Sequence, residues 1–180
     1  KQWGRFIETA GSDIQWKGIY AKGPTGSIAA GRMDVYVPDG YIWQDIGNYY
    51  GAGTSGLNWN ENQYDVVFRS GRPGDTTAIV AVKPVQDNVR IRNYVTAGKA
   101  GSGDNAFIYS GPFAREAVIR GTVPPSRSAF SISGSMPDPS YSCLSDLRRT
   151  IQAAGANVDT IHTAMTIPAI FKTSDSISYR

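Results

Sequence analysis

The sequence has 180 residues, enough for one domain or for two small lobes that share a core. Its 41% hydrophobic and 18% charged residues are typical of a folded globular protein and argue against a disordered chain. The formal net charge of +3 comes without any run of Lys or Arg, so no nucleic-acid partner is predicted. No stretch approaches the roughly 20 apolar residues of a membrane span.

In chain order, the first predicted elements are a short helix over residues 4–19 and an extended segment over 26–40. From residue 63 onward the pattern becomes that of a β protein. Tyr64, Val66 and Phe68 alternate with more polar positions, which predicts a strand with one buried face. The apolar run at 77–82 predicts a more fully buried strand. Further strands are predicted at 89–95, 105–110, 117–123 and 129–133, separated by Gly and Pro turns.

The clearest helix is predicted near 139–154. Asp138 is suited to cap its start, Pro139 to occupy its first turn, and Gly155 to end it. A final extended segment is predicted from residue 160. The fold class is therefore predicted to be α+β: a β-rich chain with mostly antiparallel sheet and a few short helices.

Gly51, Gly53 and Gly56 have the G-x-G-x-x-G spacing of a dinucleotide-binding loop. That motif requires a buried strand before it and a helix after it. The preceding residues include Asp45 and Gly47, which interrupt a strand, and the following residues lead into a strand. The glycines are therefore interpreted as a structural loop, and no cofactor is predicted.

No complete catalytic set is visible in the sequence. The nearest match to an S-x-x-K motif runs from Thr96 to Lys99 and places a threonine at the nucleophile position. His162 is the single histidine, and Cys143, the single cysteine, lies within the predicted helix, where a packed thiol is expected. One imidazole and one thiol are too few for a His- or Cys-based metal site, so no metal is predicted.

Two long blocks, over residues 38–68 and 118–158, resemble class C low-molecular-mass penicillin-binding proteins, which are serine D-alanyl-D-alanine carboxypeptidases and endopeptidases. The first block is similar to the family segment G-W-x-W-x-D-x-x-x-Y/F-x-A. The second contains a G-x-x-P turn followed by Pro-Asp-Pro and a helix. The resemblance implies that residues 1–180 form one accessory region, inserted between the S-x-x-K and S-x-N motifs, with a nested β-rich sub-lobe at about 64–125. The catalytic residues would then lie outside this chain.

The resemblance also implies a substrate-binding role for Asp45 and Tyr50, with Trp43 beside them. In the family, the matching residues help recognise the amino-bearing third residue of the peptidoglycan stem peptide. A carboxylate can pair with an ammonium group, and an aromatic face can cover its alkyl stem. The structural alternative is that Asp45 caps a turn while Tyr50 and Trp43 fill the core; for Trp43 this alternative is favoured.

The predicted function is a non-catalytic accessory domain in peptidoglycan remodelling, inactive by itself, in the periplasm or cell envelope. Its predicted partners are the catalytic domain of the same polypeptide and the stem peptide. The alternative is a freestanding cell-wall or glycan-binding module. A small enzyme that uses Thr96 and Lys99, or His162, is the third hypothesis.

Overall fold

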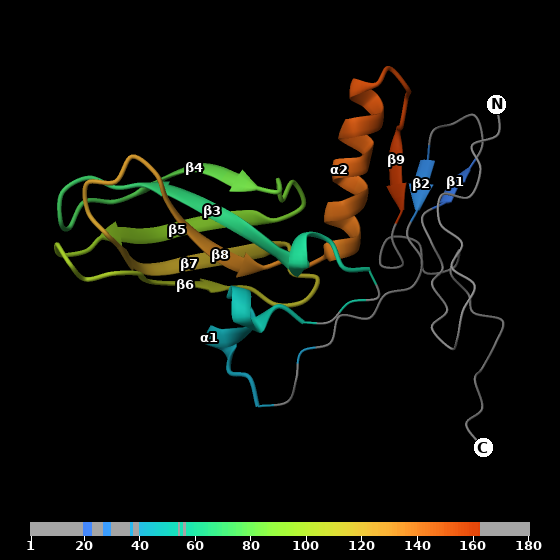
Figure 1. Ribbon diagram of the computed structural model, residues 1–180. Coiled ribbons are helices and arrows are strands. Elements are labelled where there is room, and N and C mark those ends of the chain that lie inside the picture. The colour runs from blue at the N-terminus through green and yellow to red at the C-terminus, as the bar shows by residue number, and fades with distance from the viewer. Residues whose placement is uncertain are drawn as a thin grey trace. The chain divides into compact units, whose positions relative to one another are not determined.

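The computed structural model describes residues 20–22, 27–29, 37, 40–53, 55 and 57–162 (Figure 1). In chain order, the elements of these ranges are β1 (Tyr20–Lys22), β2 (Ser27–Ala29), α1 (Trp43–Ile46), the 3-10 turns η1 (Tyr49–Gly51) and η2 (Asn60–Asn62), β3 (Gln63–Arg69), β4 (Ala78–Lys83), β5 (Arg90–Ala97), β6 (Asn105–Tyr109), β7 (Glu116–Val123), β8 (Phe130–Ser135), α2 (Pro139–Ala153) and β9 (Thr160–His162). The chain divides into two compact units. One spans Asp34–Ser142, and the other contains β1, β2, β9 and the part of α2 from Cys143 onward.

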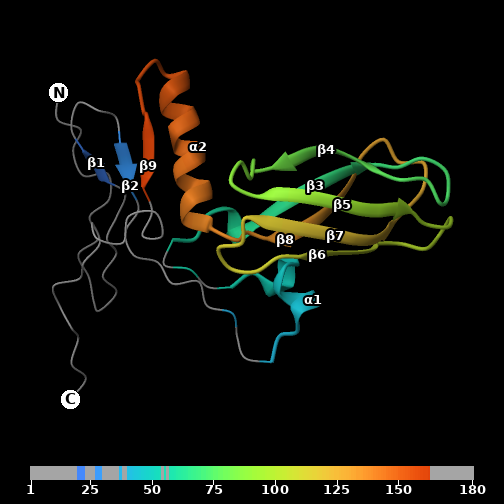
Figure 2. The ribbon, with the colours of Figure 1, turned by 180° about the vertical axis from the view of Figure 1, so that it is seen from behind.

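The Asp34–Ser142 unit is built from two three-stranded sheets, with strand orders β4-β3-β8 and β5-β7-β6. Both views show the sheets lying against each other (Figures 1 and 2). One hydrophobic cluster joins them, because β3 and β8 contribute to it from one sheet and β5, β6 and β7 from the other. Four of the six strand pairings in the described part of the chain are antiparallel, while β5–β7 and β2–β9 are parallel. The predicted α+β class with mostly antiparallel sheet is confirmed.

Strand β3 forms the centre of its sheet. Its burial alternates from residue to residue, which confirms the predicted strand with one buried face. Tyr64, Val66 and Phe68 are each at most 1% exposed and point into the shared core. Burying the apolar side chains of Val66 and Phe68 contributes roughly 1.5–3 kcal/mol each, relative to leaving them in water. This alternation therefore sets which face of the sheet is buried.

The prediction of a fully buried strand at 77–82 was wrong. Strand β4 occupies nearly this range, but none of its residues is fully buried, and Val80 remains 47% exposed. The reason is that β4 lies at the edge of its sheet, where only Ile79 and Val82 pack against the core. An apolar run alone does not distinguish an edge strand from a central one.

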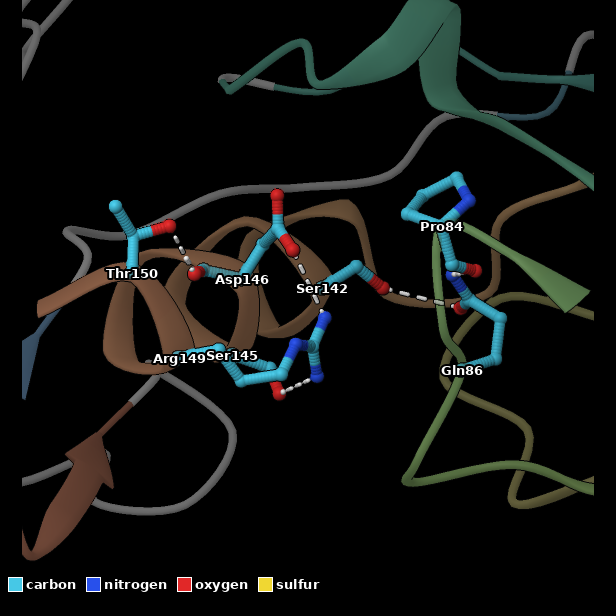
Figure 3. A network of polar contacts seen from close by, with 7 residues as sticks. All are labelled: Pro84, Gln86, Ser142, Ser145, Asp146, Arg149 and Thr150. Atoms are coloured by element: carbon cyan, nitrogen blue, oxygen red, sulfur yellow. Dashed lines mark hydrogen bonds and ion pairs between the residues drawn. The ribbon is translucent and has the colours of Figure 1, made fainter. Parts of the chain in front are cut away.

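Helix α2 begins and ends where the sequence predicted. The backbone N–H of Tyr141 donates to Asp138 Oδ1 over 2.9 Å, which confirms Asp138 as the N-cap. Pro139 occupies the first helical position, and Gly155, after the helix, has a φ of +86°. The side chain of Ser142 donates to Gln86 Oε1 over 3.0 Å, which ties the first turn to the segment after β4 (Figure 3).

The second unit contains a small three-stranded sheet in which β2 is central, antiparallel to β1 and parallel to β9. The predicted extended segments at 26–40 and from 160 onward include β2 and β9. The predicted helix over 4–19 lies outside the described residues, as does the continuation of the last segment after His162. The single accessory region with a sub-lobe at about 64–125 stays a prediction.

Candidate functional site

A short aromatic segment, residues 41–52, forms α1 and η1 beside the β5-β7-β6 sheet, where α1 packs against β6. Asp45 holds its first turn together. The backbone N–H of Asp45 donates to the carbonyl of Ile42 over 2.9 Å, and the N–H of Ile42 donates back to Asp45 Oδ2 over 3.3 Å. A carboxylate that accepts the first free N–H of a helical turn is a capping interaction. Asp45 therefore has the structural role that the sequence offered as an alternative.

The same turn brings Tyr50 to Asp45, five residues earlier in the chain. Burial raises the pKa of the Tyr50 hydroxyl, and so do the charge of Asp45 and a hydrogen bond to its carboxylate. The ring of Tyr49 packs edge-on against that of Tyr50, with centroids 5.1 Å apart. The Tyr50 side chain remains 44% exposed. Asp45 and Tyr50 thus present a carboxylate and an aromatic hydroxyl together at the surface.

Trp43 is also at the surface, with 58% of the residue exposed. The structural alternative that placed Trp43 and Tyr50 in the core, which was favoured for Trp43, is therefore wrong. The benzo edge of the indole faces the backbone of Gly111, just after β6, where a Cβ would lie 3.4 Å from Trp43 Cζ3. Trp43 also lines a surface cavity of about 360 Å³ over β6 and β7. These contacts come from residues that lie far from Trp43 in the sequence, so no local sequence pattern indicates them.

Gly47 and Asn48 fix this segment to both sheets, and sequence reasoning missed them. The Gly47 carbonyl accepts the N–H of Ser135 at the end of β8, and Asn48 forms a β-bridge with Gly134. On the other side, Asn48 Oδ1 accepts the backbone N–H of Ile108 in β6 over 3.0 Å. Asn48 Nδ2 donates to the carbonyl of Gln44, within the segment itself. The chain thus crosses between β8 and β6 at Asn48, which is 4% exposed.

Close backbone approach explains two glycines of the segment. A Cβ on Gly47 would lie 2.0 Å from the Ile108 carbonyl oxygen, and a Cβ on Gly51 would lie 2.1 Å from the Asp45 carbonyl oxygen. Real Cβ atoms do not approach backbone atoms so closely, so both positions require glycine. An α-helix that opened at Gly51 would be needed for pyrophosphate binding, but the described residues after it lead through η2 into β3. The dinucleotide interpretation is therefore rejected on structural grounds.

The other candidate residues do not assemble into a site. Thr96 lies in β5 and Lys99 is exposed in the loop that follows, with no hydrogen bond between their side chains in the described structure. His162 is the last residue of β9. Cys143 is buried, as predicted, and burial together with the charge of Asp146 raises the pKa of its thiol to about 11. A thiol with this pKa is a poor nucleophile at neutral pH.

Within the described ranges, no group of three or more His, Cys, Asp and Glu side chains is arranged to hold a metal ion. None of the helices in this part of the chain is long and apolar enough to cross a membrane.

The fold is similar to part of a solved penicillin-binding protein. The crystal structure of penicillin binding protein 4 (dacB) from Haemophilus influenzae matches 69% of this chain with a TM-score of 0.51 and 14% sequence identity. A second structure of that protein, complexed with a novel beta-lactam, matches 61% of the chain with a TM-score of 0.45 and 12% identity. The alignments cover 27% and 25% of those chains, so this chain spans about a quarter of their length. No curated protein sequence matches it.

The sequence itself shows the family. Residues 30–170 match the D-Ala-D-Ala carboxypeptidase 3 (S13) family. Because this range is more than half of the chain, the chain belongs to that family, as its resemblance to class C low-molecular-mass penicillin-binding proteins predicted.

Proposed function

We propose that this chain is a non-catalytic accessory region of a serine D-alanyl-D-alanine carboxypeptidase or endopeptidase that acts on peptidoglycan. Membership of the S13 family supports the activity of the parent polypeptide. The similarity to about a quarter of a longer penicillin-binding protein supports a part of a larger enzyme. The catalytic domain of the same polypeptide would then be its partner, in the periplasm or cell envelope.

The observation that carries a role in substrate recognition is the surface pair of Asp45 and Tyr50 beside Trp43. Asp45 supplies a carboxylate for an ammonium group on the third residue of the stem peptide, and the exposed ring of Tyr50 supplies apolar area for the alkyl stem. The two connections of Asn48, to β8 and to β6, keep the segment in place. A rigidly held carboxylate loses little entropy when a ligand binds.

The test uses the natural full-length enzyme with Asp45→Asn, because an asparagine oxygen still accepts the N–H of Ile42 while the charge is lost. We expect kcat/KM to fall about tenfold for a stem peptide with a free amine on its third residue, as for the loss of one charge-assisted hydrogen bond. For the same peptide with that amine acetylated, kcat/KM should stay unchanged. An equal loss on both peptides would show that Asp45 serves only the fold.

The non-catalytic role has its own test. A fluorescent penicillin should leave the 180-residue chain unlabelled, and a covalent adduct on it would overturn this part of the proposal.

Four exposed side chains of the same segment favour a second candidate function, a freestanding glycan-binding module. Tyr41, Ile42, Trp43 and Tyr49 are between 41% and 62% exposed, and the three aromatic side chains among them can stack on sugar rings. The flanking coding sequence distinguishes the two functions. An S-x-x-K motif upstream, with S-x-N and K-T-G downstream, supports the accessory region. Natural termini at residues 1 and 180, with binding to purified glycan strands, would support the module.

A further inference from the structure

The outer face of the β5-β7-β6 sheet combines basic and aromatic side chains. Residues that pair across the three strands point to the same face of a sheet. Two such rows lie on the side away from the core: Arg92, Val118 and Tyr109 form one, and Tyr94, Arg120 and Phe107 form the other. Their inward neighbours Ala117 and Ile119 are fully buried. We call these six residues the outer face.

A cavity of about 360 Å³ lies on this outer face, bounded on one side by Trp43 from α1. Its other walls are Tyr109, Val118, Arg120 and Glu116. A cavity of this size is at the lower end of the range for small-ligand sites, which fits one or two side chains of a ligand. Trp43, Tyr109 and Val118 give it apolar walls, while Arg120 and Glu116 add one positive and one negative group.

The positive charge of Arg120 dominates this cavity, because the negative charge of Glu116 is already paired with another residue. Arg92 Nε lies 2.9 Å from Glu116 Oε1, so the Glu116 carboxylate is paired within the sheet. No ion pair of Arg120 occurs with any described residue. The guanidinium of Arg120 can therefore bind an anionic partner. It offers two parallel N–H donors, whose spacing matches the two oxygens of a carboxylate.

We propose that this cavity is a second ligand subsite, which binds a peptide through a carboxylate that pairs with Arg120 and an adjacent apolar side chain that packs between Trp43 and Val118. The benzo edge of Trp43 is directed at the backbone of Gly111, which holds the indole beside Val118 as an apolar wall suited to an alkyl group. The subsite differs from the Asp45–Tyr50 pair in the charge of its ligand: it binds an anion, whereas the pair binds an ammonium group.

The test is an NMR titration of the ¹⁵N-labelled full-length protein with the peptide acetyl-Leu-Glu-Ala-amide. Its matched control contains Gln in place of Glu, which removes the charge and preserves the shape. We expect the Glu peptide to shift the Trp43 indole and the Arg120 amide and to bind about tenfold more tightly than the Gln peptide. Raising the salt from about 0.05 to about 0.5 M should weaken the binding of the Glu peptide and leave that of the Gln peptide unchanged, because salt screens exposed charges.

Variants of two arginines complete the design. Arg120→Gln should abolish the preference for the Glu peptide, and Arg120→Lys should keep only part of it, because an ammonium group retains the charge but lacks the paired N–H donors. Arg69→Gln, at an exposed position of β3 in the other sheet, should change nothing. Equal affinity for both peptides, an unchanged preference in Arg120→Gln, or tighter binding of N-acetylmuramic acid than of the peptide would each overturn the proposal.

This subsite does not depend on Asp45. The probe peptide carries no amine, and the readout is binding rather than turnover. A failure of the Asp45→Asn experiment therefore leaves this result intact, and the reverse also holds.

Discussion

Replacing Asn48 with alanine should destabilise the Asp34–Ser142 unit through two groups that lose their partners. The N–H of Ile108 donates to Asn48 Oδ1 over 3.0 Å, and Ile108 is fully buried. The carbonyl of Gln44 loses the donor Nδ2 on the other side. A buried polar group without a partner costs about 1–3 kcal/mol, and the half-buried Gln44 carbonyl recovers part of its loss from water. We therefore expect Asn48→Ala to lower the free energy of unfolding by about 2–4 kcal/mol.

Urea unfolding followed by circular dichroism measures this difference, and hydrogen exchange locates it. The Ile108 amide should exchange faster in Asn48→Ala, because its acceptor is gone. Asn105→Ala is the matched control. Asn105 is exposed on β6 and its amide donates to the Ser102 carbonyl over 2.8 Å, so its loss should cost less than about 1 kcal/mol. A cost below about 0.5 kcal/mol for Asn48→Ala, with unchanged exchange at Ile108, would refute the role of Asn48 as the connection between the sheets.

Three further predictions concern the same unit and helix α2. Gly47→Ala should prevent α1 from docking, because its Cβ would lie 2.0 Å from the Ile108 carbonyl oxygen; near-UV circular dichroism should show lost aromatic signals, and a native spectrum would contradict this. Cys143 should react with Ellman's reagent at pH 8 only after unfolding in urea, because burial raises the pKa of its thiol to about 11. In Asp45→Asn, the pKa of Tyr50 should fall from its raised value, since the charge of Asp45 is removed while the burial is kept. Ultraviolet titration with Tyr50→Phe as the reference measures this shift, and an unchanged pKa would mean that burial alone raises it.

Burial of Tyr64 adds a pH dependence to stability. Its hydroxyl lies in the core, and burial raises its pKa far above the ordinary value of 10.0. The stabilisation from keeping it protonated is complete below pH 10 and is lost as the pH rises, since the unfolded chain releases this proton first. Alkaline unfolding above about pH 10 should therefore be weaker in Tyr64→Phe, which keeps the ring and lacks the titrating group.

Local patterns in the sequence were sufficient for several elements. The alternation at Tyr64, Val66 and Phe68 identified the buried face of β3, because a strand repeats every two residues. Asp138 and Gly155 marked the ends of α2, because capping depends on side chains and backbone angles within a few residues. For the exposed aromatic residues of segment 41–52, neither strand alternation nor helix capping indicated where the side chains lie. Trp43 was expected in the core, yet its contacts at Gly111 and the cavity walls come from strands at the other end of the unit's sequence.

The sequence by itself therefore determined the family, the class of fold and the segment that holds Asp45 and Tyr50, since motif residues and periodicity are local properties. Only the tertiary structure decided that Gly47 and Asn48 join β8 to β6, and that Arg92 pairs with Glu116 and leaves Arg120 as the positive group of the outer face. These depend on which strands lie side by side. Strand order and register bring together residues of β5 and β7 that lie more than twenty positions apart along the chain, and no local pattern encodes that pairing.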